Sequence, residues 1–375
     1  MGVEIQKKSI ESVDFFKGIA MLLVVLVHSI QRFSVPNWFN VIPSLGQLGC
    51  QVFFVISGFS LCLGYSNKKI KYVDFMKRRI SKLIIGYWTM ILFYLLLNIF
   101  FAIIHNESVV ALLKDPGLFL NLLFLHGFST DKAVVNGIVR GGWFVGTITV
   151  LYMLFPILLK IFNNQNSKWT KIKTVAFPLI AYVLSCSVFC LLGIFKNDYV
   201  FENNSVSYFS FLNQLPCFVL GFSIYELYKS NTFSSIRFSF AKFVLCSAAA
   251  LCLFFAKQEN ALIFMSFLVA VAFFYVFVWS QNCGLIAKKI SSDSLGVKII
   301  KKFGKISFSV YLTHPLIVHL LVKPIIENLN EIYDNNILWY LLLCPVMFVL
   351  SYFLAVLFQW YESVVNKIIR KVLNK

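Results

Sequence analysis

Long apolar runs constrain what this chain can fold into more than any other feature of its sequence. Several of them reach the roughly 20 residues that an α-helix needs to cross a bilayer. Only 13% of the 375 residues are charged, about half the share found in a soluble domain. Apolar residues make up 59% of the chain, and its mean hydropathy is +0.79. The sequence therefore predicts an all-α, polytopic helix bundle in a membrane.

We expect about ten transmembrane helices, one for each long apolar run. Their ranges are 13–33, 45–65, 83–104, 143–162, 174–195, 207–228, 238–256, 260–280, 303–323 and 337–361. A shorter run, 117–128, is too brief to span and predicts a re-entrant or interfacial helix. The first span follows a polar N-terminus and has no small-residue cleavage site, which is typical of an uncleaved signal anchor.

Membrane topology accounts for the net charge of +18. With both termini in the cytoplasm, most of the 34 Lys and Arg residues lie on the cytoplasmic side. This bias is the positive-inside pattern of multi-pass proteins. Both termini are therefore predicted to be cytoplasmic. Membrane lipids are expected partners of the protein, and no nucleic-acid partner is expected.

One domain is expected over residues 1–375. It has a membrane core over about 12–361 and a basic cytoplasmic tail over 362–375, and we expect no appended soluble domain. The nine cysteines form no CxxC pair and lie mostly within the spans. They are interpreted as small apolar packing residues, and no metal site is expected.

Three ionisable residues share one stripe of the first span. At about 100° per residue, Lys17 and His28 are about 20° apart on the helix, and Asp14 lies within about 60° of both. His28 sits about 16 Å deeper than Lys17, and Gln31 and Arg32 continue the stripe. A lone histidine in a span often only packs, and a terminal lysine can snorkel. Intramembrane charge of this kind also marks functional sites and substrate paths.

A second polar segment, "FGKISFSVYLTHPL" (303–316), places Tyr311 and His314 in the ninth span. Counted inward from Lys305, His314 lies about 13 Å deep. This depth is similar to that of His28, so the two histidines are predicted to share a polar cavity. His319 is expected near the outer interface.

Basic residues gather in "SNKKIKYVDFMKRRISKLIIGYW" (66–88), before and at the start of the third span. Such a cluster can simply set topology and contact anionic lipids. Alternatively, Arg78, Arg79 and Lys82 form a cationic fork that holds the phosphates of a donor such as coenzyme A. Trp143, at the start of the fourth span, is either an interfacial belt residue or part of an outer entry.

Four stretches, in this order, resemble the integral-membrane acyltransferase type 3 family. They are "DFFKGIAMLLVVLVH" (14–28), "GCQVFFVISGF" (49–59), "DFMKRRISKLIIGYW" (74–88) and "FGKISFSVYLTHPL" (303–316). The first resembles the family's pattern of a basic residue, ten intervening residues and a histidine. The third resembles its Arg-x-x-Arg donor region. The run "GGWFVGTITVLYMLFP" resembles the family's tryptophan-to-proline motif.

This resemblance implies an O-acyltransferase that takes an acyl group, usually acetyl, from cytoplasmic acyl-CoA as co-substrate. The acceptor would be a hydroxyl of an extracytoplasmic or lipid-linked glycan, in the cell membrane. Carried over by position, His28 matches the essential histidine, with Lys17 and Asp14 beside it. Arg78, Arg79 and Lys82 match the donor-binding group. The acceptor or cavity residues implied are Ser57, Trp143, Tyr311 and His314.

The chain departs from the family pattern in two places. Lys17 stands where arginine is common, which keeps the charge but loses the bidentate fork. Ile148 and Thr149 stand where a glutamate often follows the tryptophan. Some relatives also carry a fused extracytoplasmic domain. This chain is expected either to transfer directly or to hand the group to a separate extracytoplasmic partner.

Two chemical roles remain open for His28, as a general base toward the acceptor or as a transient acyl-imidazole. A rival class is a glycan or small-molecule transporter or flippase that uses the intramembrane His, Asp and Lys residues. A third is an inactive sensor or assembly partner, which only the missing glutamate favours.

Overall fold

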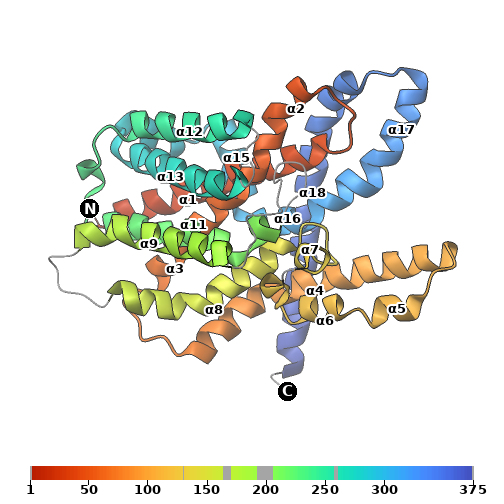
Figure 1. Cartoon of the computed structure of the whole chain (residues 1–375), viewed down its shortest axis with the longest axis horizontal. Coiled ribbons are helices and arrows are strands. Elements are labelled where there is room, and N and C mark those ends of the chain that lie inside the picture. Colours follow the sequence, from red (N-terminus) through yellow and green to blue (C-terminus); the bar gives the residue numbers. More distant parts are fainter. Residues whose placement is uncertain (1, 130, 164–169, 192–205, 257–260, 374–375) are drawn as a thin grey trace.

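The computed structural model consists of helices and the segments that connect them (Figure 1). It describes residues 2–129, 131–163, 170–191, 206–256 and 261–373. No strand occurs among these residues. The long helices are α1 (Gly2–Ile30), α3 (Gly49–Tyr65), α4 (Tyr72–Ile104), α8 (Trp143–Asn163), α9 (Thr170–Leu191), α11 (Phe211–Lys229), α12 (Ser239–Ala256), α13 (Ala261–Asn282) and α18 (Asn336–Leu373).

Shorter helical pieces connect and extend the long helices. They are α2 (Asn37–Ser44), η1 (Leu45–Leu48), α5 (Val109–Leu113), α6 (Pro116–Leu122), η2 (His126–Phe128), α7 (Lys132–Asn136), α10 (Val206–Phe209), η5 (Phe233–Ser235), α14 (Gly284–Ile290), α15 (Leu295–Lys305), α16 (Ser307–Leu316), the π-helical η6 (Ile317–Val322) and α17 (Lys323–Ile332).

The described parts of all ten predicted spans fall mainly on helices, and the prediction of an all-α polytopic bundle is confirmed. The predicted span ends 192–195 and 260 lie outside the described residues. Among the described residues, eight helical segments are long and apolar enough to cross a membrane, against the ten expected. The two that fall short are α11 and α12. Buried amides interrupt the apolar face of α11, and the apolar part of α12 is short, Ser239–Phe254.

Those amides bind α11 to its neighbours. Gln51 of α3 donates a hydrogen bond to the side-chain oxygen of Gln214 at 3.1 Å, and Asn213 donates to Ser266 of α13 at 3.2 Å. Hydrogen bonds between buried side chains hold helices together where lipid leaves little hydrophobic driving force. The polar residues that weaken α11 as a span therefore fix it in the bundle.

Glycines bring α1 into backbone contact with α15. A Cβ on Gly18 would lie 2.0 Å from the carbonyl oxygen of Ile300, and one on Gly304 would lie 1.8 Å from that of Asp14. Small residues at a crossing let helix backbones approach this closely. Because α15 leads directly into α16, the contact also fixes the polar segment of α16 against α1.

Phenylalanine rings fill the centre of the bundle. Phe75 of α4 stacks on Phe155 of α8 with ring centroids 5.4 Å apart, and Phe155 packs on Phe222 of α11 at 5.7 Å. Offset and edge-to-face pairs of this kind add to the stabilisation from apolar burial. Four of the nine cysteines, Cys50, Cys62, Cys217 and Cys344, are buried among apolar residues, and all nine are free thiols.

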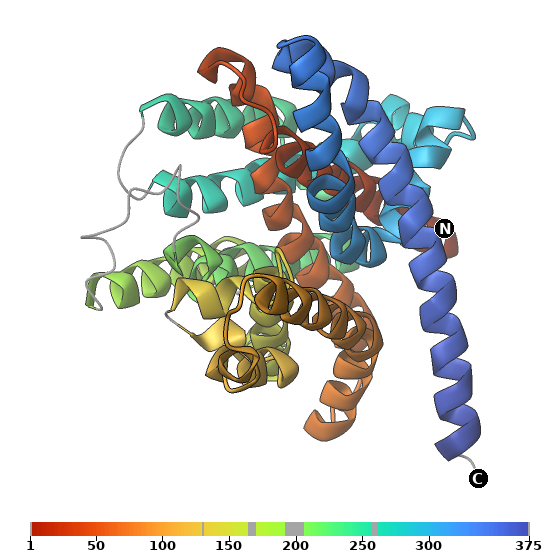
Figure 2. The same cartoon turned by 90° about the vertical axis from the view of Figure 1, so that its right-hand side faces the viewer.

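Two segments outside the main bundle bear on the site. The run 117–128 forms α6 and η2, which are too short to span. The η2 turn packs on the start of α8, where Gly127 meets the backbone of Gly146, and α6 packs on α4 and α7. Helix α18 continues without a break through the basic segment as far as Leu373. Figures 1 and 2 show its last turns reaching beyond the neighbouring helices to the C-terminus.

Candidate active site

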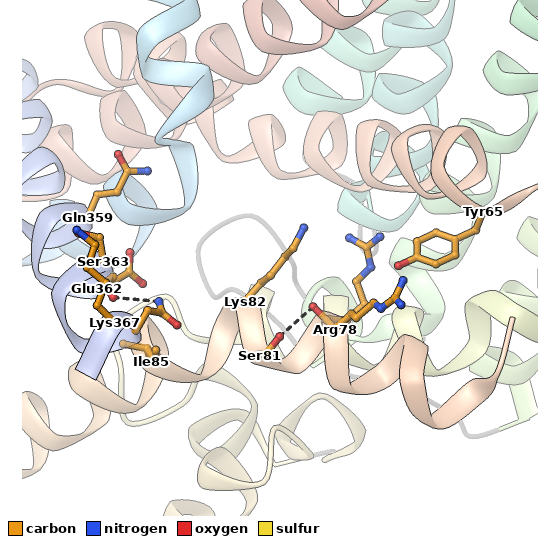
Figure 3. Close-up of a pocket in the computed structure, with 11 residues that line it drawn as sticks. Tyr65, Arg78, Ser81, Lys82, Ile85, Gln359, Glu362, Ser363 and Lys367 are labelled. Atoms are coloured by element: carbon orange, nitrogen blue, oxygen red, sulfur yellow. Dashed lines mark hydrogen bonds between the residues drawn. The ribbon is translucent and has the colours of Figure 1, made fainter. Parts of the chain in front are cut away.

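A basic cavity of about 770 Å³ opens between the first half of α4 and the last turns of α18. Arg78, Arg79 and Lys82 line it from α4, as the predicted donor group requires. Figure 3 shows Lys82 extending into the space between the two helices. The face of α18 across the cavity is polar, and its lining residues are Gln359, Glu362, Ser363, Asn366 and Lys367.

Aromatic rings hold Arg79. Its guanidinium carbon lies 5.1 Å from the ring centre of Tyr65, 5.6 Å from that of Phe75 and 5.8 Å from that of Tyr152. Guanidinium planes are attracted to aromatic faces at such distances. Arg78, one residue earlier, is exposed. The two arginines of the predicted fork therefore have different surroundings, one oriented by packing and the other solvated.

Glu362 places one carboxylate in this otherwise cationic cavity. Ser309 of α16 donates a hydrogen bond to its Oε2 at 3.3 Å. Gly86 of α4 leaves room for the other oxygen, since a Cβ there would lie 2.3 Å from Oε1. A carboxylate only accepts hydrogen bonds. It therefore suits an amine or a hydroxyl on a ligand, while the α4 cations suit phosphates.

A central cavity of about 290 Å³ adjoins the basic cavity, and Arg79 and Lys82 line both. Lys17 of α1, Ser57 of α3 and Tyr311 of α16 also line the central cavity. The rest of its wall is mainly apolar. Ile148 faces the same space, whereas Thr149 is buried and donates to the carbonyl oxygen of Val145. Of the two positions where an acid was expected, only that of Ile148 therefore points at the cavity.

His28 lies in a third space, a pocket of about 220 Å³ that Trp143 also lines; we call it the His28 pocket. The ring centre of His28 is 5.1 Å from that of His314, so the two histidines lie side by side as expected. His314 does not line the His28 pocket, so the shared polar cavity stays a prediction. His28 Nδ1 lies 3.2 Å from Oε1 of Gln31. An amide oxygen only accepts, so Nδ1 donates and the lone pair of the neutral ring is on Nε2.

His314 has the same tautomer. Its Nδ1 lies 3.0 Å from the carbonyl oxygen of Val310, which accepts the hydrogen bond. Its Nε2 is buried, with no hydrogen-bond partner in the described part of the chain. Two imidazoles thus meet with their basic nitrogens unprotonated, an arrangement that can accept a proton from a hydroxyl or attack a carbonyl carbon.

Tyr311 separates the central cavity from the His28 pocket. It lines the central cavity, and its hydroxyl donates a hydrogen bond to the carbonyl oxygen of Gly141, which lines the His28 pocket. Its ring packs on Phe144 with centroids 5.2 Å apart. Gly141 has φ +76°, a conformation that glycine adopts without strain. One side chain and one turn therefore form the partition.

The comparison with known families agrees with this geometry. A family model described as an acyltransferase domain, type 3, matches residues 10–356. The chain belongs to the acyltransferase type 3 family. No curated protein and no solved structure matches it. It is therefore a multi-pass membrane acyltransferase, and the match covers every predicted site residue.

In this acyltransferase, nine of the ten predicted site residues line one of the three cavities or touch a residue that does. Asp14 does not. It lines none of the cavities, and its backbone packs against Gly304 of α15. Lys17 and Asp14 form no ion pair among the described residues. The roles of all ten residues in catalysis or binding remain predictions.

Several residues that face these cavities were not singled out from the acyltransferase sequence. Glu362 and Lys367 lie beyond the matched region, and only the packing of α18 against α4 brings them to the basic cavity. Arg140 directly precedes the two glycines before Trp143, and Arg32 continues the polar stripe of α1. For Arg32 and Arg140, the sequence feature that could have indicated a role in the site was a charged residue next to a family motif.

His126 is a further buried group. Its Nε2 donates to the carbonyl oxygen of Gly142 at 3.0 Å, and Tyr87 donates to Asn121 beside it at 2.7 Å. This network ties α4 and α6 to the turn before α8. It supports the wall of the His28 pocket.

Proposed function

We propose that this acyltransferase moves an acyl group, acetyl in the simplest case, from cytoplasmic acyl-CoA to a hydroxyl of an extracytoplasmic or lipid-linked cell-surface glycan. The observation that supports the proposal is the arrangement of the three cavities, with the central cavity between the basic cavity and the His28 pocket. The basic cavity shares Arg79 and Lys82 with the central cavity. Tyr311 lines the central cavity and donates a hydrogen bond to Gly141, which lines the His28 pocket. Donor and acceptor can therefore approach the partition from opposite sides.

On the donor side, the phosphates of acyl-CoA would bind Arg78, Arg79 and Lys82. Charge-assisted hydrogen bonds to phosphate are among the strongest that a protein surface can offer. The adenosine would lie toward the polar face of α18, where Glu362 can accept from an amine or a hydroxyl. The pantetheine arm would extend through the mainly apolar central cavity past Lys17, which leaves the thioester at Tyr311.

On the acceptor side, His28 Nε2 would take the proton of the hydroxyl as its oxygen attacks the thioester carbonyl carbon. The carbon–sulfur bond breaks, and coenzyme A leaves as the free thiol after taking up a proton. In the second route, Nε2 attacks first, releases the thiol and carries the acyl group until the hydroxyl displaces it. Both routes give the same ester, and both need the lone pair of Nε2.

The protein would lie in the cell membrane with both termini in the cytoplasm. Direct transfer to the glycan requires no other protein. If the group is handed on instead, a separate extracytoplasmic transferase would receive it. Family membership favours acyl transfer over the transporter alternative.

The test is the alkali-labile O-acyl content of cell-surface glycans, measured by mass spectrometry. Cells with the intact gene are compared with a deletion strain and with His28→Ala, whose membrane level is checked by immunoblot. We expect the ester groups to be lost in both mutants, which would also identify the acceptor. Unchanged acylation would overturn the proposal. Accumulation of an unmodified glycan inside the cell would indicate a transporter.

A further inference from the structure

Two arginines meet in the His28 pocket without a counter-charge. Arg32 follows α1, Arg140 precedes α8, and both line the pocket together with His319 of η6. No carboxylate is among the residues that line it. Within the described part of the chain, neither guanidinium forms an ion pair.

One imidazole holds the two guanidiniums side by side. Arg32 Nη2 donates to Nδ1 of His319, and Arg140 Nη1 donates to the same nitrogen at 3.1 Å. Arg32 Nη2 also lies 3.3 Å from Nε2 of the same ring. A guanidinium has no acceptor and an unprotonated ring nitrogen has one lone pair, so the two guanidiniums share a single acceptor and each still has donors to satisfy. His319 therefore positions the arginines without neutralising them.

Like charges this close are unfavourable unless something compensates them. The pKa of Arg32 is lowered from its ordinary value, mainly by burial and secondly by the positive charge of the neighbouring Arg140. Arg32 Nε is also buried with no hydrogen-bond partner among the described residues. A buried donor of this kind carries a desolvation penalty. A planar oxyanion would satisfy it and would bridge the two guanidiniums.

The position of the arginine pair connects it to the chemistry. Arg32 lies four residues after His28, and both side chains line the same pocket. The volume of about 220 Å³ is below the range of ordinary ligand sites, so it suits one sugar ring rather than an oligosaccharide. An anion held by the arginines would keep a hydroxyl of the same ring near His28 Nε2.

We propose that the His28 pocket selects an acidic sugar, whose carboxylate or phosphate binds between Arg32 and Arg140 while its hydroxyl faces His28. This inference rests on the proposed O-acyl transfer and specifies the class of acceptor. The anion could instead come from a lipid headgroup, and the experiment separates these two sources.

The test measures how fast diethyl pyrocarbonate modifies His319 and His28 in the full-length protein. The protein is held in phosphatidylcholine nanodiscs, and modified peptides are quantified by mass spectrometry. Glucuronate is the acidic probe, glucose is its neutral counterpart, and inorganic phosphate is a second anion. We expect glucuronate to slow modification several-fold and glucose to have no effect. The protection should disappear in Arg32→Gln and Arg140→Gln and should largely remain in Arg140→Lys.

Matched controls keep the result specific. Arg237→Gln removes an exposed arginine on the connection between α11 and α12 and should leave the protection intact. Each variant is compared with itself, with and without glucuronate, because losing an arginine alters the reactivity of His319 directly. Arg140 is exposed, so its substitution should leave the fold intact, and thermal unfolding checks this.

Three results would overturn the inference. They are equal protection by glucose and glucuronate, no protection by glucuronate or phosphate, and protection by phosphatidylglycerol nanodiscs alone, which would assign the pair to a lipid headgroup. Binding of acetyl-CoA, measured by equilibrium dialysis, separates this inference from the proposed function. Acetyl-CoA binding without glucuronate protection means that the acidic-acceptor inference alone has failed. Glucuronate protection without acetyl-CoA binding means that the donor proposal has failed.

Discussion

At the scale of single residues, the two adjacent arginines of the basic cavity provide a matched pair. Arg79 lies over three aromatic rings, whereas Arg78 is exposed. Lysine keeps the charge but loses the planar stacking surface. Losing about 1 to 2 kcal/mol of cation–π attraction should raise KM for acyl-CoA about 5- to 30-fold in Arg79→Lys. Arg78→Lys should change KM little. Equal effects in the two variants, measured by initial rates, would contradict the role of the rings.

His314 allows function and stability to be separated. Its buried Nε2 has no partner in the described part of the chain, so replacing the imidazole with a ring of similar shape removes an unsatisfied polar atom. The same substitution gives up the hydrogen bond from Nδ1 to the carbonyl oxygen of Val310. The two effects oppose each other, so His314→Phe should change the free energy of unfolding by less than about 1 kcal/mol. Without the second basic nitrogen beside His28, kcat should fall by about 10²-fold or more.

Thermal unfolding and single-turnover transfer would measure the two effects on the same preparation. Full activity in a folded His314→Phe protein would make His314 a packing residue. The companion variant His314→Gln restores a polar group, and partial recovery of kcat would support a role in proton transfer.

At the scale of elements, the crossing of α1 and α15 holds the two histidines together. The carbonyl oxygen of Asp14 stands where a Cβ on Gly304 would be placed. Gly304→Ala must therefore force the two backbones apart, at about 1 to 3 kcal/mol or more for an overpacked contact. Because α16 follows α15, transfer activity should fall as well. Gly296→Ala, on the same helix with no atom within 4 Å of its Cβ, should stabilise the protein by about 0.5 to 1 kcal/mol. Thermal unfolding of both variants tests the contrast.

Sequence reasoning predicted the elements well and the site in part, for identifiable reasons. Depth along a helix follows from residue counting, so His28 and His314 were correctly placed at one level. Angle along the helix is a weaker guide. Asp14, about 60° from Lys17 on the helix, lines none of the cavities that Lys17 and His28 line, although its carboxyl still interacts electrostatically with Lys17. Ile148 was noted as a missing acid, and it does face the central cavity.

What the sequence did not reveal depends on packing between distant segments. Glu362 reaches the basic cavity only because α18 crosses α4 at Gly86. Arg32 and Arg140 are more than a hundred residues apart and meet only through His319. In α11, Asn213 and Gln214 reduce the apolar signal of a span because they serve the neighbouring helices. No periodicity in one segment encodes such contacts.

At the scale of the whole molecule, the three cavities imply sidedness. The basic cavity and the His28 pocket are lined by polar and cationic groups, and the mainly apolar central cavity lies between them. A charged donor such as acetyl-CoA cannot cross a bilayer unaided, because transferring its phosphates into hydrocarbon is prohibitively unfavourable. If the basic cavity faces the cytoplasm, as the distribution of Lys and Arg predicts, the donor must be supplied from that side.

Sealed membrane vesicles of opposite orientation test this sidedness. Labelled acetyl-CoA added to inside-out vesicles, whose cytoplasmic face is exposed, should acylate the endogenous glycan. Sealed right-side-out vesicles should remain unlabelled until a pore-forming agent admits the donor. The Arg79→Lys protein should lower the rate in inside-out vesicles and recover it as acetyl-CoA is increased, because the substitution weakens donor binding and leaves His28 unchanged. Equal labelling of both sealed orientations would place the donor entrance on the outer face, and the assignment of the basic cavity to the cytoplasm would then be wrong.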